Sequence, residues 1–430
     1  MFSPLFIYVA FFALFASIPV FLCLLFAAQV GFIAADQAFF LKMLPQRLFA
    51  GIDTFTLLAL PFFLLAGEIM GKGGITERLA KLANLLVGRM RGGLAQVNTV
   101  VSVLFASLTG SAIASTSAVG SMLIPTMTKE GYPKDFSTAL TAAGSVIGPI
   151  IPPSIIMVIY AFIMNVSVGA LFMAGIIPGI LFCIVIMVIN AYFAKKYAFP
   201  KRETTVSRAE VVSTVSQAIL PLITPVIIVG GILSGTFSPT EAGAIAVLYS
   251  LILCLFVTKT LKLQDLPELF IKSGITTATV LLVIGSALVF SWILTLSGLP
   301  LQLNQFILGI SDNPYVLLIL FNIVLLIAGM FLDAGAALLI LGPTLIPPLV
   351  QAGADPIHIA IIACINLSIG VITPPFGVVL FVASSMSDIP VGRIIKAVMP
   401  YLIGQLILLG FITYIPEISL FLPRLMGFMN

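Results

Sequence analysis

Two apolar segments of this chain carry the same pattern of proline and glycine, the second 222 positions after the first. The first holds Gly120, Leu123, Ile124, Pro125, Gly131, Gly148, Pro152 and Pro153, and the second holds Gly342, Leu345, Ile346, Pro347, Gly353, Gly370, Pro374 and Pro375. Proline lacks a backbone donor and clashes with the preceding turn, so each Pro-Pro pair must break a buried helix. Lipid cannot satisfy the freed backbone groups. Paired broken segments in two halves therefore indicate the binding site of a secondary transporter.

The composition places the chain in a membrane. Its residues are 60% hydrophobic and only 8% charged, whereas soluble domains have about 25% charged residues. The net charge of +4 is small, and the basic residues lie beside apolar spans, which indicates topology signals and no nucleic-acid partner. The N-terminal apolar segment has no positive region before it, so we expect a retained helix. Single cysteines lie in four separate apolar stretches and are expected to be core residues: Cys23, Cys183, Cys254 and Cys364.

Membrane crossings need about 20 apolar residues each. The sequence predicts them near 3–17, 19–36, 53–71, 137–164, 167–193, 217–235, 239–258, 274–296, 357–386 and 398–416. Two further apolar stretches, 94–128 and 315–350, are too long for one crossing and carry small residues at their centres. Each is predicted to form a re-entrant hairpin of two half-length helices.

Basic residues predict that the two hairpins enter from opposite sides. The first is flanked by Lys72, Arg78, Lys81, Arg89 and Arg91 and by Lys129 and Lys134, whereas the flanks of the second, 297–314 and 351–356, have no Lys or Arg. By the positive-inside rule the first hairpin has a cytoplasmic base and the second an outer base. Both termini are then outside. Lys42 and Arg47 also fall outside, against the rule.

The fold class predicted is an all-α polytopic membrane protein with two inverted repeats, each containing a re-entrant hairpin and a Pro-broken helix. The first repeat is 1–208, with scaffold helices in 1–92 and a transport-domain hairpin and broken helix in 93–193. The second is 209–430, with scaffold helices in 215–296 and transport-domain elements in 315–425.

Seven longer runs carry a resemblance to a known family. They are PQRLFAGIDTFTLLALPFFLLAGEIM (45–70), GGITERL (73–79), GRMRGGLAQVN (88–98), GSVIGPIIPPSIIMVIY (144–160), FSPTEAGAIAV (237–247), LDAGAALLILGPTLIPP (332–348) and NLSIGVITPPFGVVLFVAS (366–384). With these runs the chain resembles the large membrane subunit of tripartite ATP-independent periplasmic (TRAP) transporters from about residue 19 to 425.

The resemblance implies an elevator-type fold, like that of the ion transporter superfamily, in a bacterial inner membrane. It also implies sodium as the coupling ion with no other cofactor, a small four-helix membrane subunit and a periplasmic substrate-binding protein as partners, and organic acids such as sialic acids or C4-dicarboxylates as substrates. Many members carry an acidic residue where this chain has Ser115, in GSAIASTSAVG. That difference leaves the substrate and the first ion site open.

Candidate ligands lie at the hairpin tips and helix breaks, because sodium favours oxygen ligands and broken helices supply carbonyls. The predicted sodium ligands are Ser111, Gly144, Ser145, Gly148 and Pro149 in the first repeat and Gly335, Ala336, Asn366, Ser368, Gly370 and Thr373 in the second. The predicted substrate-binding residues are Ser111, Ser115, Thr116, Ser117, Asp333 and Gly335. The alternative for the small residues is close helix packing. For Asp333 the alternative is a helix cap.

Other polar residues stay open at this stage. Glu68 and Glu241 fit either a structural ion pair or cap, or a role in gating or a subunit interface. Arg47 is expected to contact lipid headgroups, with a carboxylate or a partner as alternatives. His358, the single histidine, is expected to be structural, and Trp292 is expected at the lipid interface.

Two other function classes compete with a transporter. A channel would need a continuous polar pore, and a carrier could work without a binding protein. An intramembrane hydrolase would need HExxH, an Asp pair or a nucleophile beside a base, which one histidine does not provide. The sequence has no GxxxxGK[ST] loop, so ATP is not expected to drive the chain directly.

Cysteine accessibility tests the predicted orientation. Because only the first hairpin has basic flanks, Lys129→Cys and Gly353→Cys should react with a membrane-impermeant maleimide from opposite faces of the membrane. Labelling of both positions from one face would contradict the inverted-repeat arrangement.

Overall fold

The computed structural model describes residues 5–16, 18–199, 207–299, 301–302, 305, 309, 311 and 313–428. Every long regular element in these residues is a helix, as expected for the all-α class. Eight of the described helical segments are long and apolar enough to cross a membrane. The chain is a multi-pass membrane protein.

The helices of the first half follow the predicted order, with two further helices at 44–52 and 75–87. They are α1 (Leu5–Phe15), α2 (Val20–Ala34), η1 (Ala38–Met43), α3 (Leu44–Ile52), η2 (Phe55–Leu58), α4 (Ala59–Lys72), α5 (Ile75–Val87), α6 (Gly93–Thr109), α7 (Ala112–Lys129), α8 (Lys134–Ser145), α9 (Ile155–Met164) and α10 (Val168–Lys196).

The second half repeats much of this order. Its elements are α11 (Arg208–Leu233), α12 (Pro239–Ile252), η3 (Leu253–Val257), η4 (Leu263–Asp265), α13 (Leu266–Ser297), α15 (Pro314–Phe331), α16 (Ala334–Gln351), α17 (Pro356–Gly370), α18 (Val378–Ser387), α19 (Val391–Tyr414) and α20 (Glu417–Leu425).

Helix ends recur at the sequence offset. Helix α16 begins and ends 222 positions after α7, and α17 begins 222 positions after α8. Both Pro-Pro bonds, Pro152-Pro153 and Pro374-Pro375, are cis. The predicted helix breaks are confirmed, because α8 stops before the first pair and α17 before the second, and α9 and α18 start after them.

Two lengths differ from those expected. In the described residues, α1 and α2 have 11 and 15 residues, so α2 is shorter than the crossing expected near 19–36, and part of the crossing expected near 3–17 lies outside the described residues. They pack against each other as a short pair. The hairpin arms α6, α7, α15 and α16 have 17 or 18 residues, longer than the half-length helices expected.

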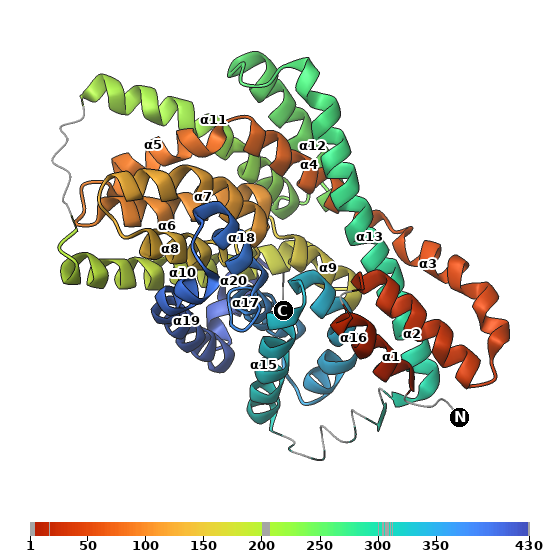
Figure 1. The fold of residues 1–430 in the computed structure, drawn as a ribbon. Helices are drawn as coiled ribbons and strands as arrows, with labels where there is room; N and C mark the ends of the chain where they lie inside the picture. Colours follow the sequence, from red (N-terminus) through yellow and green to blue (C-terminus); the bar gives the residue numbers. More distant parts are fainter. Residues whose placement is uncertain are drawn as a thin grey trace.

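One group of helices is assembled around α13, which runs along one side of the molecule from α12 to α1 and α2 (Figure 1). Helix α4 packs on α12 and α13, and α13 also packs on α2 and α3. Ion pairs fasten α4 to the start of α13. Lys272 Nζ lies 2.8 Å from Glu68 Oε2, and Lys72 pairs with Glu268 and with Asp265.

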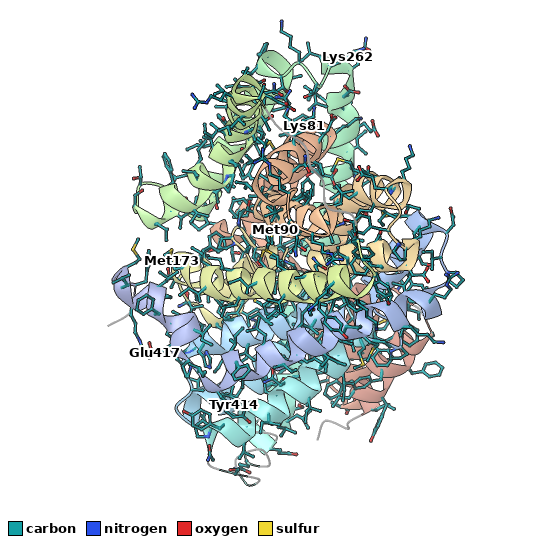
Figure 2. The ribbon with its side chains drawn as sticks, turned by 90° about the vertical axis from the view of Figure 1, so that its left-hand side faces the viewer. Lys81, Met90, Met173, Lys262, Tyr414 and Glu417 are labelled. Atoms are coloured by element: carbon teal, nitrogen blue, oxygen red, sulfur yellow. The ribbon has the colours of Figure 1, made fainter. Side chains whose placement is uncertain are left out.

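A second group contains the two hairpins and the two broken helices. The hairpin α6–α7 packs on α8, and the hairpin α15–α16 packs on α17. Helix α7 also packs on α18, and α16 packs on α9, so each hairpin contacts the far half of the other broken helix. Figure 2 shows Lys81 of α5 and Lys262, just before η4, toward one end of the molecule and Tyr414 of α19 and Glu417 of α20 toward the other. The boundaries of the two groups as domains stay predictions.

A close contact between α15 and α17 allows a test of this packing. A Cβ at Gly370 of α17 would lie 2.7 Å from the Cα and carbonyl carbon of Gly329 in α15, so Gly370→Ala must push the helices apart. We expect a loss of about 1–3 kcal/mol, the usual range for overpacking.

The measurement is the thermal unfolding midpoint in detergent. Gly392→Ala in α19 is the matched control, because a Cβ there meets no atom within 4 Å. It should leave the midpoint unchanged or raise it slightly. Equal midpoints for both variants would contradict the tight contact.

Candidate functional site

The first hairpin tip covers the first helix break. The turn between α6 and α7 lies at Gly110 and Ser111. A Cβ at Gly148, in the break, would lie 3.0 Å from the carbonyl carbon and oxygen of Ser111, so only glycine lets the tip and the break approach this closely. Two predicted sodium ligands, Ser111 and Gly148, are therefore neighbours.

The second tip meets the second break in a similar way. The turn between α15 and α16 lies at Leu332 and Asp333. The backbone N–H of Gly377, just before α18, donates to the carbonyl of Met330 at 3.2 Å. Gly370, at the end of α17, touches Gly329, one turn before the tip. Each break is thus covered by the hairpin of its own half.

Four helix N-termini open onto these contacts. Ser111 caps α7, Ser154 caps α9 and Asp333 caps α16, each through a side-chain oxygen that accepts from a backbone N–H of the first turn. Gly377 precedes α18 with a positive φ of 48°. Gly335 at the start of α16 faces Ile159 of α9, where a Cβ would meet the Cδ1 at 3.2 Å. Helix N-termini carry partial positive charge and favour anions such as a carboxylate.

The donor set at the breaks is neutral oxygen. The carbonyls of Ser145 and Gly370 accept from the backbone N–H groups of Gly148 and Thr373, and each carbonyl oxygen has a second lone pair, whereas the Gly144 carbonyl accepts from both Val146 and Ile147. The hydroxyls of Ser145 and Thr373 donate to Ala142 O and Ile369 O at 2.8 Å, so their oxygens remain free to accept. The described residues contain no group of three His, Cys, Asp or Glu side chains that could hold a metal ion. Such donors suit a hard monovalent cation better than a transition metal.

Two buried oxygens of predicted ligands have no hydrogen-bond partner. They are Ser115 Oγ in α7 and Asn366 Oδ1 in α17, and both residues are fully buried. Unpaired buried polar atoms are rare and costly in folded proteins. These two atoms are therefore the best candidates to contact an ion or a substrate.

The other predicted residues differ in their burial and their partners. Residues at the two breaks and at the start of α16 are buried: Gly144, Ser145, Gly148, Pro149, Gly335, Ala336, Gly370 and Thr373. The side chains of Thr116 and Ser368 are buried but bond to their own helices, at Ala112 O and Cys364 O. Ser117 lies on the exposed side of α7. Asp333 has the capping role that was the alternative for it, with Oδ2 accepting from Gly335 N at 3.0 Å.

A buried polar network beside the breaks was missed by the sequence analysis. Asn98 donates to Thr141, Gln405 donates to Ala143 O, and Tyr401 donates to Asn190. Asn366, which was predicted as a sodium ligand, donates to Asn322. The amide side chains inside these apolar spans were the available signal, because polar side chains in membrane helices hydrogen-bond across helices.

The open charged residues have structural partners. Glu68 pairs with Lys272, and Glu241 forms a capping box with Ser238 at the start of α12. The Arg47 guanidinium lies 4.8 Å from the centroid of the Trp292 ring, a cation–π contact, while the expected contact with lipid headgroups stays a prediction. Trp292 also packs on Phe32 and Phe40, and its expected place at the lipid interface stays a prediction.

His358 is structural, as expected. Its Nδ1 lies 2.7 Å from Ser419 Oγ and its Nε2 3.2 Å from Thr413 O, which joins α17 to α19 and α20.

Comparisons with known proteins agree with this geometry. Residues 7–418 match the family described as the tripartite ATP-independent periplasmic transporter, DctM component. The chain is 43% identical over 415 residues to the sialic acid TRAP transporter large permease protein SiaM of Vibrio cholerae, covering 96% of each. It is 41% identical over 386 residues to the C4-dicarboxylate TRAP transporter large permease protein DctM of Pseudomonas aeruginosa, covering 90% of each. Its fold is similar to that of the YdaH transporter of Alcanivorax borkumensis, with a TM-score of 0.63, 17% identity and coverage of 95% and 96%.

Replacement of Ser115 separates a binding role from a packing role. Because its hydroxyl has no partner, Ser115→Ala should leave the unfolding midpoint unchanged or slightly higher. If the hydroxyl contacts substrate, half-maximal uptake should require severalfold more substrate. Ser121→Ala, on the exposed side of the same helix, is the control. Uptake by Ser115→Ala equal to that of the control would remove Ser115 from the binding site.

Proposed function

This chain belongs to the DctM family of tripartite ATP-independent periplasmic transporters, and from this premise we propose that it is the translocation subunit of a sodium-coupled importer of small organic acids. Membership of the DctM family makes the chain a subunit of a transporter. Sialic acids and C4-dicarboxylates are the substrate classes of two relatives and are proposed for this chain. The proposed location is the bacterial inner membrane.

The observation that carries the proposal is the pair of tips lying over two helix breaks. Each half supplies one hairpin, one broken helix and a set of neutral oxygens at the break. Helix N-termini at the tips favour the carboxylate of a substrate, and the carbonyl ends of α8 and α17 favour a cation. A substrate carboxylate and a coupling cation bound side by side would each lower the free-energy cost of burying the other's charge.

An elevator movement is proposed for the hairpin group against the α13 group. Support comes from the packing, because α13 packs on α2, α3 and α4, each hairpin packs on the broken helix of its own half, and pairs such as α13 with α16 and α4 with α6 join the groups. We also propose the two partners of a tripartite system, a small four-helix membrane subunit and a periplasmic binding protein. The alternatives are a channel, or a sodium-coupled carrier that needs no binding protein.

Reconstitution tests the proposed function. Proteoliposomes with the chain, the small subunit and the binding protein should show saturable uptake of the acid under an inward sodium gradient. Omitting either partner, or replacing sodium with choline, should abolish most uptake. Robust uptake of free substrate by the chain alone would contradict the tripartite reading, and an ohmic current would favour a channel.

Two hydroxyl variants test the proposed ion sites. Ser145→Ala and Thr373→Ala each remove one oxygen donor at a break, so each should raise the sodium concentration needed for half-maximal uptake. Ser137→Ala is a suitable control, because that hydroxyl bonds Pro133 O near the start of α8. An unchanged sodium dependence in both test variants would exclude these hydroxyls as ligands.

A further inference from the structure

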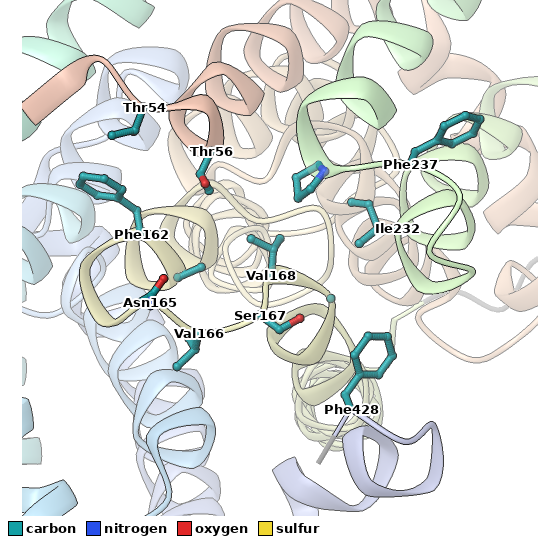
Figure 3. A pocket seen from close by; sticks show the side chains of 13 residues that line it. Thr54, Thr56, Phe162, Asn165, Val166, Ser167, Val168, Ile232, Phe237 and Phe428 are labelled. Carbon is teal, nitrogen blue, oxygen red and sulfur yellow. The ribbon is translucent and has the colours of Figure 1, made fainter. Parts of the chain in front are cut away.

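The structure has a cavity whose lining contains no residue of the hairpin tips or of the helix breaks. Its volume is about 610 Å³, within the range of small-molecule sites. Figure 3 shows Thr56, Val168, Ile232 and Phe428 around one hollow between helices. The cavity lies where α9 turns into α10, at the end of these helices opposite the basic base of the first hairpin.

The walls of this cavity come from both predicted bodies. Thr54 and Thr56 precede α4, and Ile232 and Phe237 lie at the end of α11 and just after it, all within the predicted scaffold. The opposite wall is the α9–α10 turn, residues 161–169, within the predicted transport domain. A movement of one body against the other must change the shape of the cavity.

The walls of the cavity carry no charged side chain. None of the described lining residues has an ionisable side chain, so no side chain there would favour a charged ligand over a neutral one. Most of the wall is apolar. Neutral polar groups are added by Thr54, Asn165 and Ser167, and the Thr54 hydroxyl oxygen is buried without a hydrogen-bond partner.

We propose that this cavity binds an uncharged amphipathic molecule, with an apolar chain or ring and one or more hydroxyl or amide groups, and that its occupation holds the two bodies in one relative position. The inhibitory effect rests on the proposed elevator function, whereas binding does not. A ligand that fits one arrangement of the walls stabilises that arrangement by its difference in affinity between the two states. Transport then slows without competition for the acid site.

Photolabelling of the full chain in lipid nanodiscs tests binding. The probe is an uncharged octyl glucoside that carries an alkyl diazirine, used below its micelle concentration. Cross-links should concentrate in residues 161–169 and 232–239, on both walls. Cross-links spread evenly over the lipid-facing helices would overturn the proposal.

Three variants test whether the probe occupies the cavity. Thr56→Trp fills the cavity and should reduce labelling of both segments by about tenfold, because the space that holds the probe is lost. Thr236→Trp makes the same change on the neighbouring exposed turn, outside the cavity, and should label like the unmodified chain. Ile232→Ala enlarges the cavity and should keep or increase labelling. Equal labelling of Thr56→Trp and Thr236→Trp would also overturn the proposal.

Uptake by the reconstituted complex tests the effect of occupation. The probe should lower the maximal rate and leave the half-saturating substrate concentration unchanged. Specific labelling with no change in uptake would contradict the inhibitory role. Absence of uptake in every preparation would instead contradict the proposed function, while the labelling result would stand.

Discussion

The backbone groups freed at two proline breaks are the constraint on which this structure depends. At membrane depth, an unsatisfied N–H or carbonyl costs several kcal/mol, so the breaks exist only because protein covers them. Each hairpin tip provides that cover, with Ser111 against Gly148 in one half and Met330 bonded to Gly377 in the other. The same contacts leave carbonyl lone pairs and helix N-termini available to ligands. One arrangement of the hairpin tips therefore satisfies the freed backbone groups and also provides the proposed binding groups.

The buried amide network keeps this arrangement in register. Asn98, Asn366 and Gln405 join the hairpins and α19 to the broken helices at α8 and α17. Hydrogen bonds of this kind between membrane helices contribute about 0.6 kcal/mol each on average, so their value lies in geometry more than in stability. A hairpin group held in this way can move as one body. The cavity beside the α9–α10 turn lies where such a body would meet the α13 group.

The fold could be predicted where its cause is local. The repeated pairs Pro152-Pro153 and Pro374-Pro375 identified both broken helices, and clusters of small residues identified both tips. Proline alone does not decide a break, because Pro347 and Pro348 lie inside the continuous helix α16. Helix α5 was not predicted. The charged residues Glu77, Arg78 and Lys81 were interpreted as a polar flank of the first hairpin, whereas in the structure they belong to an amphipathic helix. The contact partners of Glu68, Arg47 and Asn98 could not be predicted from the sequence either. Those contacts join residues far apart in the chain, and no local pattern encodes them.

Hydrogen–deuterium exchange of the backbone tests the central claim most directly. The claim is that both breaks are ion-binding elements as well as structural ones. In purified protein, replacing choline chloride with sodium chloride at equal ionic strength should slow exchange in residues 144–154 and 366–377 together. Helices of the α13 group should not respond. Sodium-independent exchange in both segments would contradict the account.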